Sequence, residues 1–346
     1  MLKALQIFVL FGFSLLFFST SGFAVETITL MTHDSFNISK EVLQQFEATN
    51  KVKVRFLKTG DAGAALIQAI LSKNNPLADV FFGVDNTFLS RALKADIFIP
   101  YASPLLVDIP AKLKLDQSNR LLPADYGDVC LNIDRNWFKH NNLTPPTDLA
   151  DLIKPEYRGL TVVENPATSS PGMAFLLATI GRFGEEGYLD FWKQLRANRV
   201  LVANSWNDAY YGNFTAASKG DRPIVVSYAS SPAATVFYSK ELLDQAPTAA
   251  VLGHYSAFRQ IEFVGILKGT KKQQLAEKLV DFILSRPFQE DIPLQMFVFP
   301  ANQQAKLPAV FIKYAQVAEA PAQVPPEAIE AHRQQWLEEW TDVVLR

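Results

Sequence analysis

The sequence predicts an α/β protein of two lobes with a ligand cleft between them, and two observations support this. Short β-rich runs alternate with amphipathic stretches along the chain, as in largely parallel sheets covered by helices. Two segments, 121–134 and 254–269, are extended and long enough to cross from one lobe to the other and back. We therefore expect residues 25–124 to form the first part of lobe 1 and residues 125–257 to form lobe 2. Residues 258–346 are expected to return to lobe 1 and to end in C-terminal helices.

The first part of lobe 1 is predicted to consist of three strand–helix pairs. Each pair joins a run rich in β-branched or aromatic residues to a stretch with helical periodicity. The pairs are TITLMT (27–32) with ISKEVLQQFEATN (38–50), KVKVRFL (51–57) with AGAALIQAILS (62–72), and ADVFFGV (78–84) with NTFLSRALKADIF (86–98).

The same alternation resumes after the first crossing segment. The expected elements of lobe 2 are GLTVVE (159–164), a helix opening at Ser170, RVLVAN (199–204), a helical stretch WNDAYYGNFTAASKG (206–220) and RPIVVSYA (222–229). After the second crossing we expect a helix (271–285), an irregular segment from Arg286 to Ala301, a Pro/Ala-rich connector (319–328) and a last amphipathic helix. No internal repeat is present.

The first 24 residues have the three-part pattern of a secretory signal peptide. Lys3 precedes an apolar run, and Gly22-Phe23-Ala24 closes the run with small residues at the two positions that favour cleavage. We expect cleavage after Ala24 and export to the periplasm. The alternative is an uncleaved membrane anchor, for which the apolar run is short. No cysteine follows the site, so a lipid anchor has no support.

Composition narrows the possible partners. Cys130 is the single cysteine, so the chain forms no intramolecular disulfide and its core must hold the fold. The formal net charge of −2 becomes −3 when Lys3 is removed with the signal peptide. Such a chain offers no basic surface for nucleic acid and no polybasic patch for a membrane. We expect neither partner, and we expect a monomer.

The sequence lacks the motifs of familiar enzyme classes. It has no G-x-S-x-G elbow, no P-loop, no G-x-G-x-x-G after a strand and no H-E-x-x-H. Its four histidines, His33, His140, His254 and His332, are scattered without the spacing of metal ligands. We therefore expect no catalytic residue, no bound metal and no cofactor.

The stretch ENPATSSPGMAF (164–175) predicts a helix start with polar groups to spare. Serine is favoured as N-cap and proline as the first helical residue, so we assign Ser170 as N-cap and Pro171 as N1. The free N–H groups there, with the hydroxyls of Thr168 and Ser169, would suit a phosphate, a carboxylate or another polar ligand group. The alternative is an ordinary capped helix with its other hydroxyls in water.

Polar and aromatic residues recur at the carboxyl ends of the predicted strands, where open α/β sheets bind ligands. Aromatic faces beside carboxylates would hold a flat, cationic, partly apolar small molecule by stacking and cation–π contact. Each residue alone has a simpler explanation as a helix cap or a core aromatic, so the prediction rests on six such loops together. The candidates are Asp34 in THDSF, Asp61 in TGDAG, Asp85 in GVDN, Tyr126 in PADYGD, Trp206 and Tyr210 in ANSWNDAYYG, and Tyr228 in SYASSP.

These motifs resemble the periplasmic thiamine-binding proteins of bacterial ABC importers. THDSF, ADVFFGVDN, PADYGDVCLNID, NPATSSPG, SWNDAY, SYASSPA and EDIPLQMFVFPAN occur in the family's order and at nearly its spacing, from about Thr27 to the final helix. The resemblance implies the type II periplasmic-binding fold, in which two α/β lobes joined by two crossing segments close on the ligand. It also implies capture of thiamine or a thiamine phosphate and delivery to a membrane permease driven by an ATPase.

The resemblance also implies roles for individual residues. Ser169 and Ser170 would bind a phosphate or hydroxyethyl end, and Asp61 would lie near the same polar region. The other positions implicated are His33, Asp34, Asp85, Tyr126, Trp206, Tyr210, Tyr228 and Phe297.

The chain departs from the enteric members at three positions of the stacking cage. In place of His33, Ala234 and Phe297 of this chain, each of those positions carries a different residue, an aromatic one, in the enteric members. A smaller cage lowers affinity or changes the ligand.

Two alternative functions remain open from the sequence. A ferric-ion-binding protein of the same fold would use Tyr210 and Tyr211 as phenolate ligands, with His33 and Asp61 completing the shell, although adjacent residues of a helix do not share a face. A secreted hydrolase would use Ser169 or Ser170 as nucleophile, but no histidine can be assigned beside either from the sequence.

Overall fold

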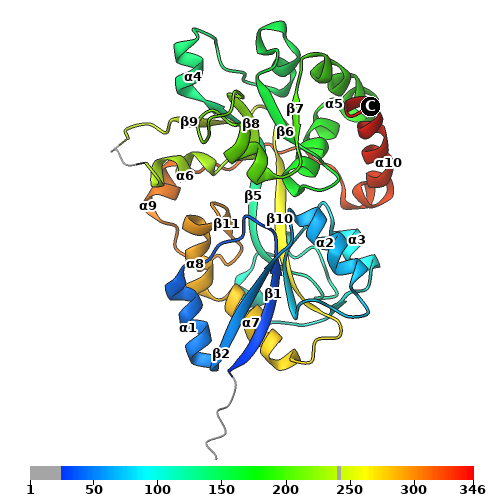
Figure 1. Cartoon of the computed structure of the whole chain (residues 1–346), viewed down its shortest axis with the longest axis vertical. Coiled ribbons are helices and arrows are strands. Elements are labelled where there is room, and N and C mark those ends of the chain that lie inside the picture. Colours follow the sequence, from blue (N-terminus) through cyan, green and yellow to red (C-terminus); the bar gives the residue numbers. More distant parts are fainter. Residues whose placement is uncertain (1–24, 240–242) are drawn as a thin grey trace, which may run out of the picture.

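The computed structural model describes residues 25–239 and 243–346, so the predicted signal peptide lies outside the described residues. One α/β lobe lies above the other in Figure 1, and two long strands run through the middle from one lobe to the other. The first is β5 (Leu122–Asp134) and the second is β10 (Phe258–Leu267). β5 matches the first predicted crossing segment. β10 begins four residues after the second one, because a turn precedes it.

The strands form one mixed sheet with the order β2-β1-β3-β10-β5-β8-β6-β7. Besides the two crossing strands, the sheet contains β1 (Glu26–Thr32), β2 (Val52–Lys58), β3 (Val80–Asp85), β6 (Thr161–Glu164), β7 (Leu201–Ala203) and β8 (Ile224–Tyr228). Three short strands are added to it: β4 (Phe98–Ile99) pairs with β10, and β9 (Thr248–Val251) and β11 (Phe299–Pro300) pair with β5. β1 is parallel to β2 and β3 in lobe 1, and β6 is parallel to β7 and β8 in lobe 2. β10 is antiparallel to β3 and β5, so the crossing strands join the two parallel halves.

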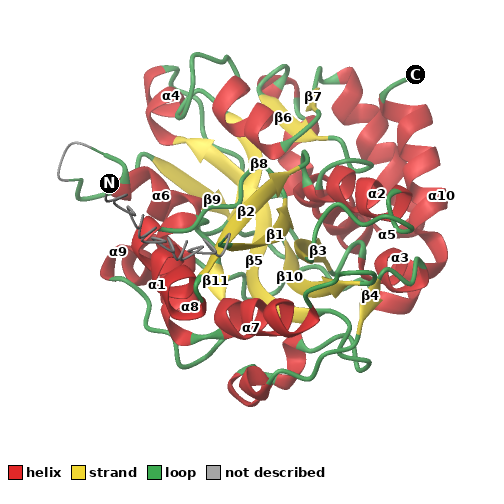
Figure 2. Ribbon diagram, turned by 60° about the horizontal axis from the view of Figure 1, so that its bottom comes forward, coloured by secondary structure: helices red, strands yellow, loops and turns green. Residues whose placement is uncertain are grey.

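Helices pack around this sheet on several sides (Figure 2). They are α1 (Lys40–Asn50), α2 (Ala62–Leu71), α3 (Leu89–Lys94), α4 (Arg135–His140), α5 (Ser170–Ala197), α6 (Ser231–Phe237), α7 (Gln273–Leu284), α8 (Arg286–Gln295), α9 (Ala309–Tyr314) and α10 (Pro326–Val344). Short 3₁₀ turns span Pro104–Asp108, Ala111–Leu113, Leu149–Ile153 and Pro155–Tyr157. Within the described ranges, no helix is both long and apolar enough to cross a bilayer.

Burial explains why several strands read as continuous apolar runs. β3 is buried at every position, and so is β5 except at Tyr126. Strands covered on both faces carry apolar residues in succession rather than in alternation. In lobe 1, the rings of Phe36 and Phe82 lie 5.0 Å apart and both face Phe288 of α8 at 6.4 Å, so apolar packing joins the loop after β1 to the return segment.

Two sequence expectations in the second half are wrong. Residues 286–295 are not irregular, because they form α8, which begins with a proline in its first turn and includes Pro293. Residues 206–220 do not form one helix, since only the π-helical turn Asp208–Asn213 is regular. Proline is disfavoured inside a helix, yet α8 includes Pro293, and in the second segment the regular part is limited to six residues.

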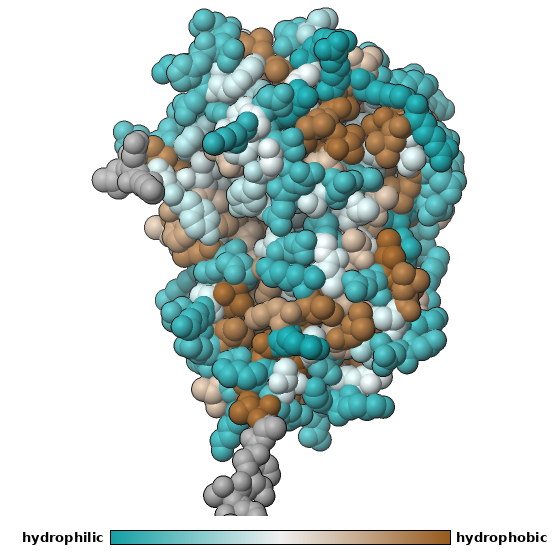
Figure 3. All heavy atoms as spheres, in the orientation of Figure 1, coloured by the Kyte–Doolittle hydropathy of each residue, from teal (hydrophilic) through white to brown (hydrophobic). Residues whose placement is uncertain are grey.

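The last helix contacts both lobes. The rings of Trp340 and Trp192 lie 5.6 Å apart, which packs α10 against α5 of lobe 2. Lys94 Nζ of α3 in lobe 1 lies 2.7 Å from Glu330 Oε1 of α10. Hydrophilic residues cover most of the face drawn in Figure 3, and its hydrophobic residues lie in separate patches.

Candidate functional site

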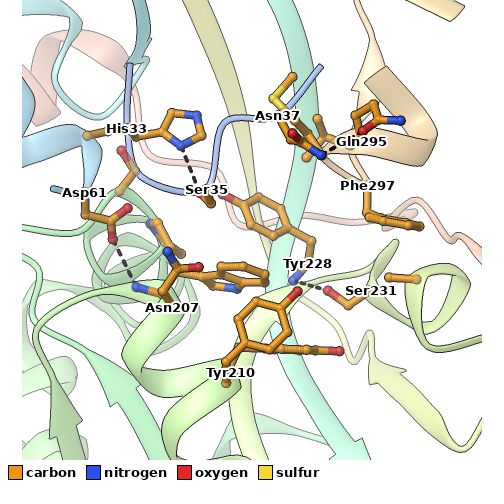
Figure 4. Close-up of a pocket in the computed structure, with 18 of the residues that line it drawn as sticks. His33, Ser35, Asn37, Asp61, Asn207, Tyr210, Tyr228, Ser231, Gln295 and Phe297 are labelled. Carbon is orange, nitrogen blue, oxygen red and sulfur yellow. Dashed lines mark hydrogen bonds between the residues drawn. The ribbon is translucent and has the colours of Figure 1, made fainter. Parts of the chain in front are cut away.

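A pocket lies between the lobes, and loops from both lobes direct side chains into it (Figure 4). The lining residues of lobe 1 and its return segment are His33, Ser35, Asn37, Asp61, Ala62, Glu262, Gln295, Met296, Phe297 and Val298; those of lobe 2 are Ser170, Pro171, Trp206, Asn207, Tyr210, Tyr211, Tyr228, Ser231, Ala234 and Tyr238. Aromatic rings dominate one side of this lining, and the charged lining residues are His33, Asp61 and Glu262.

The start of α5 differs by one residue from the sequence prediction. Ser169, not Ser170, is the N-cap: it has extended backbone angles and its Oγ accepts a hydrogen bond from Gly172 N at 3.4 Å. Ser170 is the first helical residue and Pro171 the second, both positions that tolerate a residue without a free N–H. Ser170 lines the pocket, and its buried hydroxyl lies beside the Asp85 carboxyl without a hydrogen bond of normal geometry.

Asp61 connects the two lobes. It precedes α2, but its side chain does not cap that helix. Its Oδ2 instead accepts a hydrogen bond from the backbone N–H of Trp206 in lobe 2 at 3.2 Å. Ala64 N donates to Thr168 O at 3.3 Å across the same junction, so the lobes are in contact on this side of the pocket. Burial raises the pKa of Asp61, although hydrogen bonds from Ser169 and Trp206 and the charge of His33 act in the other direction.

Lobe 2 supplies the aromatic wall. The rings of Trp206 and Tyr210 are stacked, with centroids 5.0 Å apart and planes inclined by 20°. Trp206 Nε1 donates to Ser227 Oγ at 2.9 Å, which fixes the indole. Burial raises the pKa of Tyr210 to about 12. Tyr228 donates its hydroxyl proton to Gln260 Oε1 at 2.9 Å, and this bond orients the third ring.

Tyr210 and Tyr211 face different surroundings, although both border the pocket. Tyr210 is buried and Tyr211 is 56% exposed, and their rings are inclined by 78°. Both residues belong to the π-helical turn Asp208–Asn213, and both line the pocket.

A second, more exposed aromatic group consists of Phe297, Tyr238 and Phe237, of which the sequence analysis named Phe297 alone. Tyr238 lies 5.5 Å from Phe297, and Phe237 lies 6.0 Å from the same ring. Tyr238 is four residues after Ala234, so the two positions share a face of α6 and its end. The spacing from Ala234 was the available signal.

His33 lies against a carboxylate on the crossing strand β10. Its Nδ1 is 2.8 Å from Ser35 Oγ, and its Nε2 makes an ion contact with Glu262 Oε1 at 3.5 Å. Burial opposes a charge on the imidazole, but the Glu262 carboxylate raises the pKa of His33 above its ordinary value. Gly83 lies beneath the ring with a φ of 111°, and a Cβ there would lie 2.6 Å from His33 Cδ2.

Glu262 belongs to a row of acids across three neighbouring strands, in which the sequence analysis named Asp85 but missed Glu262 and Asp125. It pairs in register with Asp85 on β3 and with Asp125 on β5. Burial raises the pKa of Asp85 to about 7. Burial and the adjacent Glu262 carboxylate raise the pKa of Asp125 well above its usual range. Cross-strand register brings these side chains together, and a single sequence does not reveal that register.

The predicted site residues fall into two groups. The pocket lining includes His33, Asp61, Ser170, Trp206, Tyr210, Tyr228 and Phe297. The other four are not among the lining residues. Asp34 is exposed and accepts a hydrogen bond from Gly60 N, and Ser169 caps α5. Asp85 accepts hydrogen bonds from the N–H groups of Thr87 and Phe88, and the ring of Tyr126 stacks on that of Phe299. Ligand contact by any of them stays a prediction.

Residues 75–317 match the family model described as bacterial extracellular solute-binding protein. The chain belongs to this family. It is 30% identical over 337 residues to the thiamine-binding periplasmic protein of Salmonella typhimurium. This alignment covers 96% of this chain and 98% of the relative. It is 29% identical over 329 residues to the thiamine-binding periplasmic protein of Escherichia coli, covering 94% and 95% of the two chains.

Solved structures agree with the fold. A periplasmic thiamin binding protein superposes with a TM-score of 0.81 at 27% identity, covering 92% of this chain and 96% of the other. A ferric binding protein from Campylobacter jejuni reaches a TM-score of 0.71 at 19% identity, covering 91% and 99%, and so shows the fold alone. The predicted type II periplasmic-binding fold is confirmed. The protein is a periplasmic solute-binding protein and not an enzyme.

Proposed function

We propose that this protein captures thiamine or a thiamine phosphate and delivers it to an ABC importer, whose permease is driven by an ATPase. The single observation that supports this best is the composition of the pocket. Stacked rings of Trp206 and Tyr210 face a lining that carries the carboxylates Asp61 and Glu262. Thiamine is flat, partly apolar and positively charged, so ring faces and carboxylates together match it. The names of the relatives are consistent with this ligand.

The start of α5 is the proposed position of the ligand's polar end. Ser170, the first residue of this helix, contributes a buried hydroxyl without a regular hydrogen-bond partner. A hydroxyethyl group or a phosphate there would satisfy this hydroxyl, and the positive end of the helix dipole would favour the phosphate.

Closure is proposed to occur about β5 and β10. Only a ligand that contacts both lobes can favour the closed state, and the pocket lining comes from both. We further propose that the mature chain starts at Val25, that it is a monomer, and that the lobe boundaries fall near residues 124 and 257.

The test is calorimetric titration of thiamine and thiamine monophosphate into protein freed of co-purified ligand. We expect saturable binding of one molecule per chain. Absence of binding by both, with tight binding of ferric ion in the same buffer, would favour the iron-binding alternative instead.

A further inference from the structure

The pocket lining has an uneven charge. Its acidic members are Asp61 and Glu262, and His33 is the one described lining residue that can carry a positive charge, since no lysine or arginine lines the pocket. Two acidic side chains therefore face one imidazole. Buried, unbalanced carboxylates are costly in a medium of low dielectric constant, so the lining favours a positively charged occupant.

The two carboxylates differ in what already binds them. Asp61 accepts hydrogen bonds from Trp206 N and from Ser169, which engages it in joining the lobes. Glu262 is 8% exposed; His33 Nε2 lies 3.5 Å from its Oε1, and Asp125 stands opposite it in register on β5. Glu262 is therefore the carboxylate with capacity for a ligand.

The neighbours of Glu262 keep it in place. Asp125 lies opposite on β5, and its raised pKa favours the protonated form, which can donate to Glu262. His33 contacts it from the loop after β1. The titratable groups that face it are His33 from that loop, Asp61 from the start of α2, Asp85 from β3, Asp125 from β5 and Tyr228 from β8.

We propose that Glu262 is the residue by which this site selects a positively charged ligand. This inference rests on the proposed function, since thiamine supplies the charge through its thiazolium ring. Because Glu262 lies on β10, the cation would attach to a crossing strand as well as to the aromatic wall of lobe 2, so its charge would contribute to closure.

The experiment compares thiamine with 3-deazathiamine, a neutral analogue in which a thiophene ring replaces the thiazolium. Dissociation constants of both are measured by calorimetry for the wild type, Glu262→Gln, Glu262→Asp, Asp61→Asn and the matched control Glu41→Gln, which removes an exposed carboxylate from α1. We expect wild type to prefer thiamine by about tenfold or more. Glu262→Gln should lose most of that preference by weakening thiamine while leaving the neutral analogue within about threefold.

The shorter Glu262→Asp keeps the charge and should keep the preference even if both affinities fall, and Glu41→Gln should change neither. Equal weakening of both ligands by Glu262→Gln would overturn the inference, because it would show a role in shape alone. Loss of the preference in Asp61→Asn but not in Glu262→Gln would assign the role to Asp61 instead. Failure of wild type to bind thiamine at all would overturn the proposed function, and this inference with it.

Discussion

Replacing Trp206 by alanine should weaken thiamine binding by roughly 10- to 150-fold, which corresponds to about 1.5–3 kcal/mol. Its ring forms the stacked pair with Tyr210 at 5.0 Å, on the wall of the pocket. A stacked aromatic contact contributes about 0.5–1.5 kcal/mol, and a cation over a desolvated ring adds up to about 2 kcal/mol. Removing the indole removes both contributions to a thiazolium or pyrimidine ring that rests on it.

The assay is calorimetric titration of thiamine, with Trp206→Phe as the matched control. Phenylalanine keeps a ring face but loses the hydrogen bond from Nε1 to Ser227, so its affinity should fall by no more than about fivefold, while stability falls by about 1 kcal/mol. Thermal melts of both variants separate the two effects. The stacking argument is refuted if the alanine variant binds like wild type, or if phenylalanine costs as much affinity as alanine.

Three further substitutions test the surroundings of the pocket. Ser170→Ala should weaken the binding of thiamine monophosphate more than that of thiamine, because a hydrogen bond to a charged group contributes about 1.5–3 kcal/mol and one to a neutral hydroxyl about 0.5–1.5 kcal/mol. Calorimetry measures both affinities, and equal losses would exclude a phosphate at the start of α5. Burial raises the pKa of Asp85 from 3.8 to about 7, so the folded state holds this proton more tightly than the unfolded state and loses stability as pH rises from 4 towards 8, by up to about 4 kcal/mol. Asp85→Asn should remove that part of the slope in denaturant unfolding measured across this range, and an unchanged slope would show that Asp85 is ionised throughout. Gly83→Ala should destabilise the protein by about 2 kcal/mol or more, since the new Cβ meets His33 Cδ2 at 2.6 Å and φ is 111°; a wild-type melting temperature would contradict this.

The architecture was accessible from the sequence because hydrophobic periodicity is a local signal. The extended run ending at Asp134 and the one around Glu262 are long, and both formed the crossing strands β5 and β10. The strand-end rule placed Asp61, Trp206 and Tyr228 near one another, because the carboxyl ends of strands from both lobes face the same pocket.

What the sequence did not reveal depends on contacts between distant segments. Glu262 lies inside a mostly apolar strand, and only the register with Asp85 and Asp125 shows that three acids meet there. Tyr238, at the end of α6, lines the pocket because the fold brings its ring against that of Phe297, a residue far away in the sequence. The N-cap was assigned to Ser170 instead of Ser169, because the sequence does not distinguish two consecutive serines and only the backbone angles do.

The most direct test of thiamine capture is native mass spectrometry of the protein purified from the periplasm without denaturation. Thiamine capture predicts a complex of one chain with one small molecule, whose released mass is that of thiamine or a thiamine phosphate, on a chain that begins at Val25. A released mass belonging to an unrelated compound, or a retained ferric ion, would contradict it.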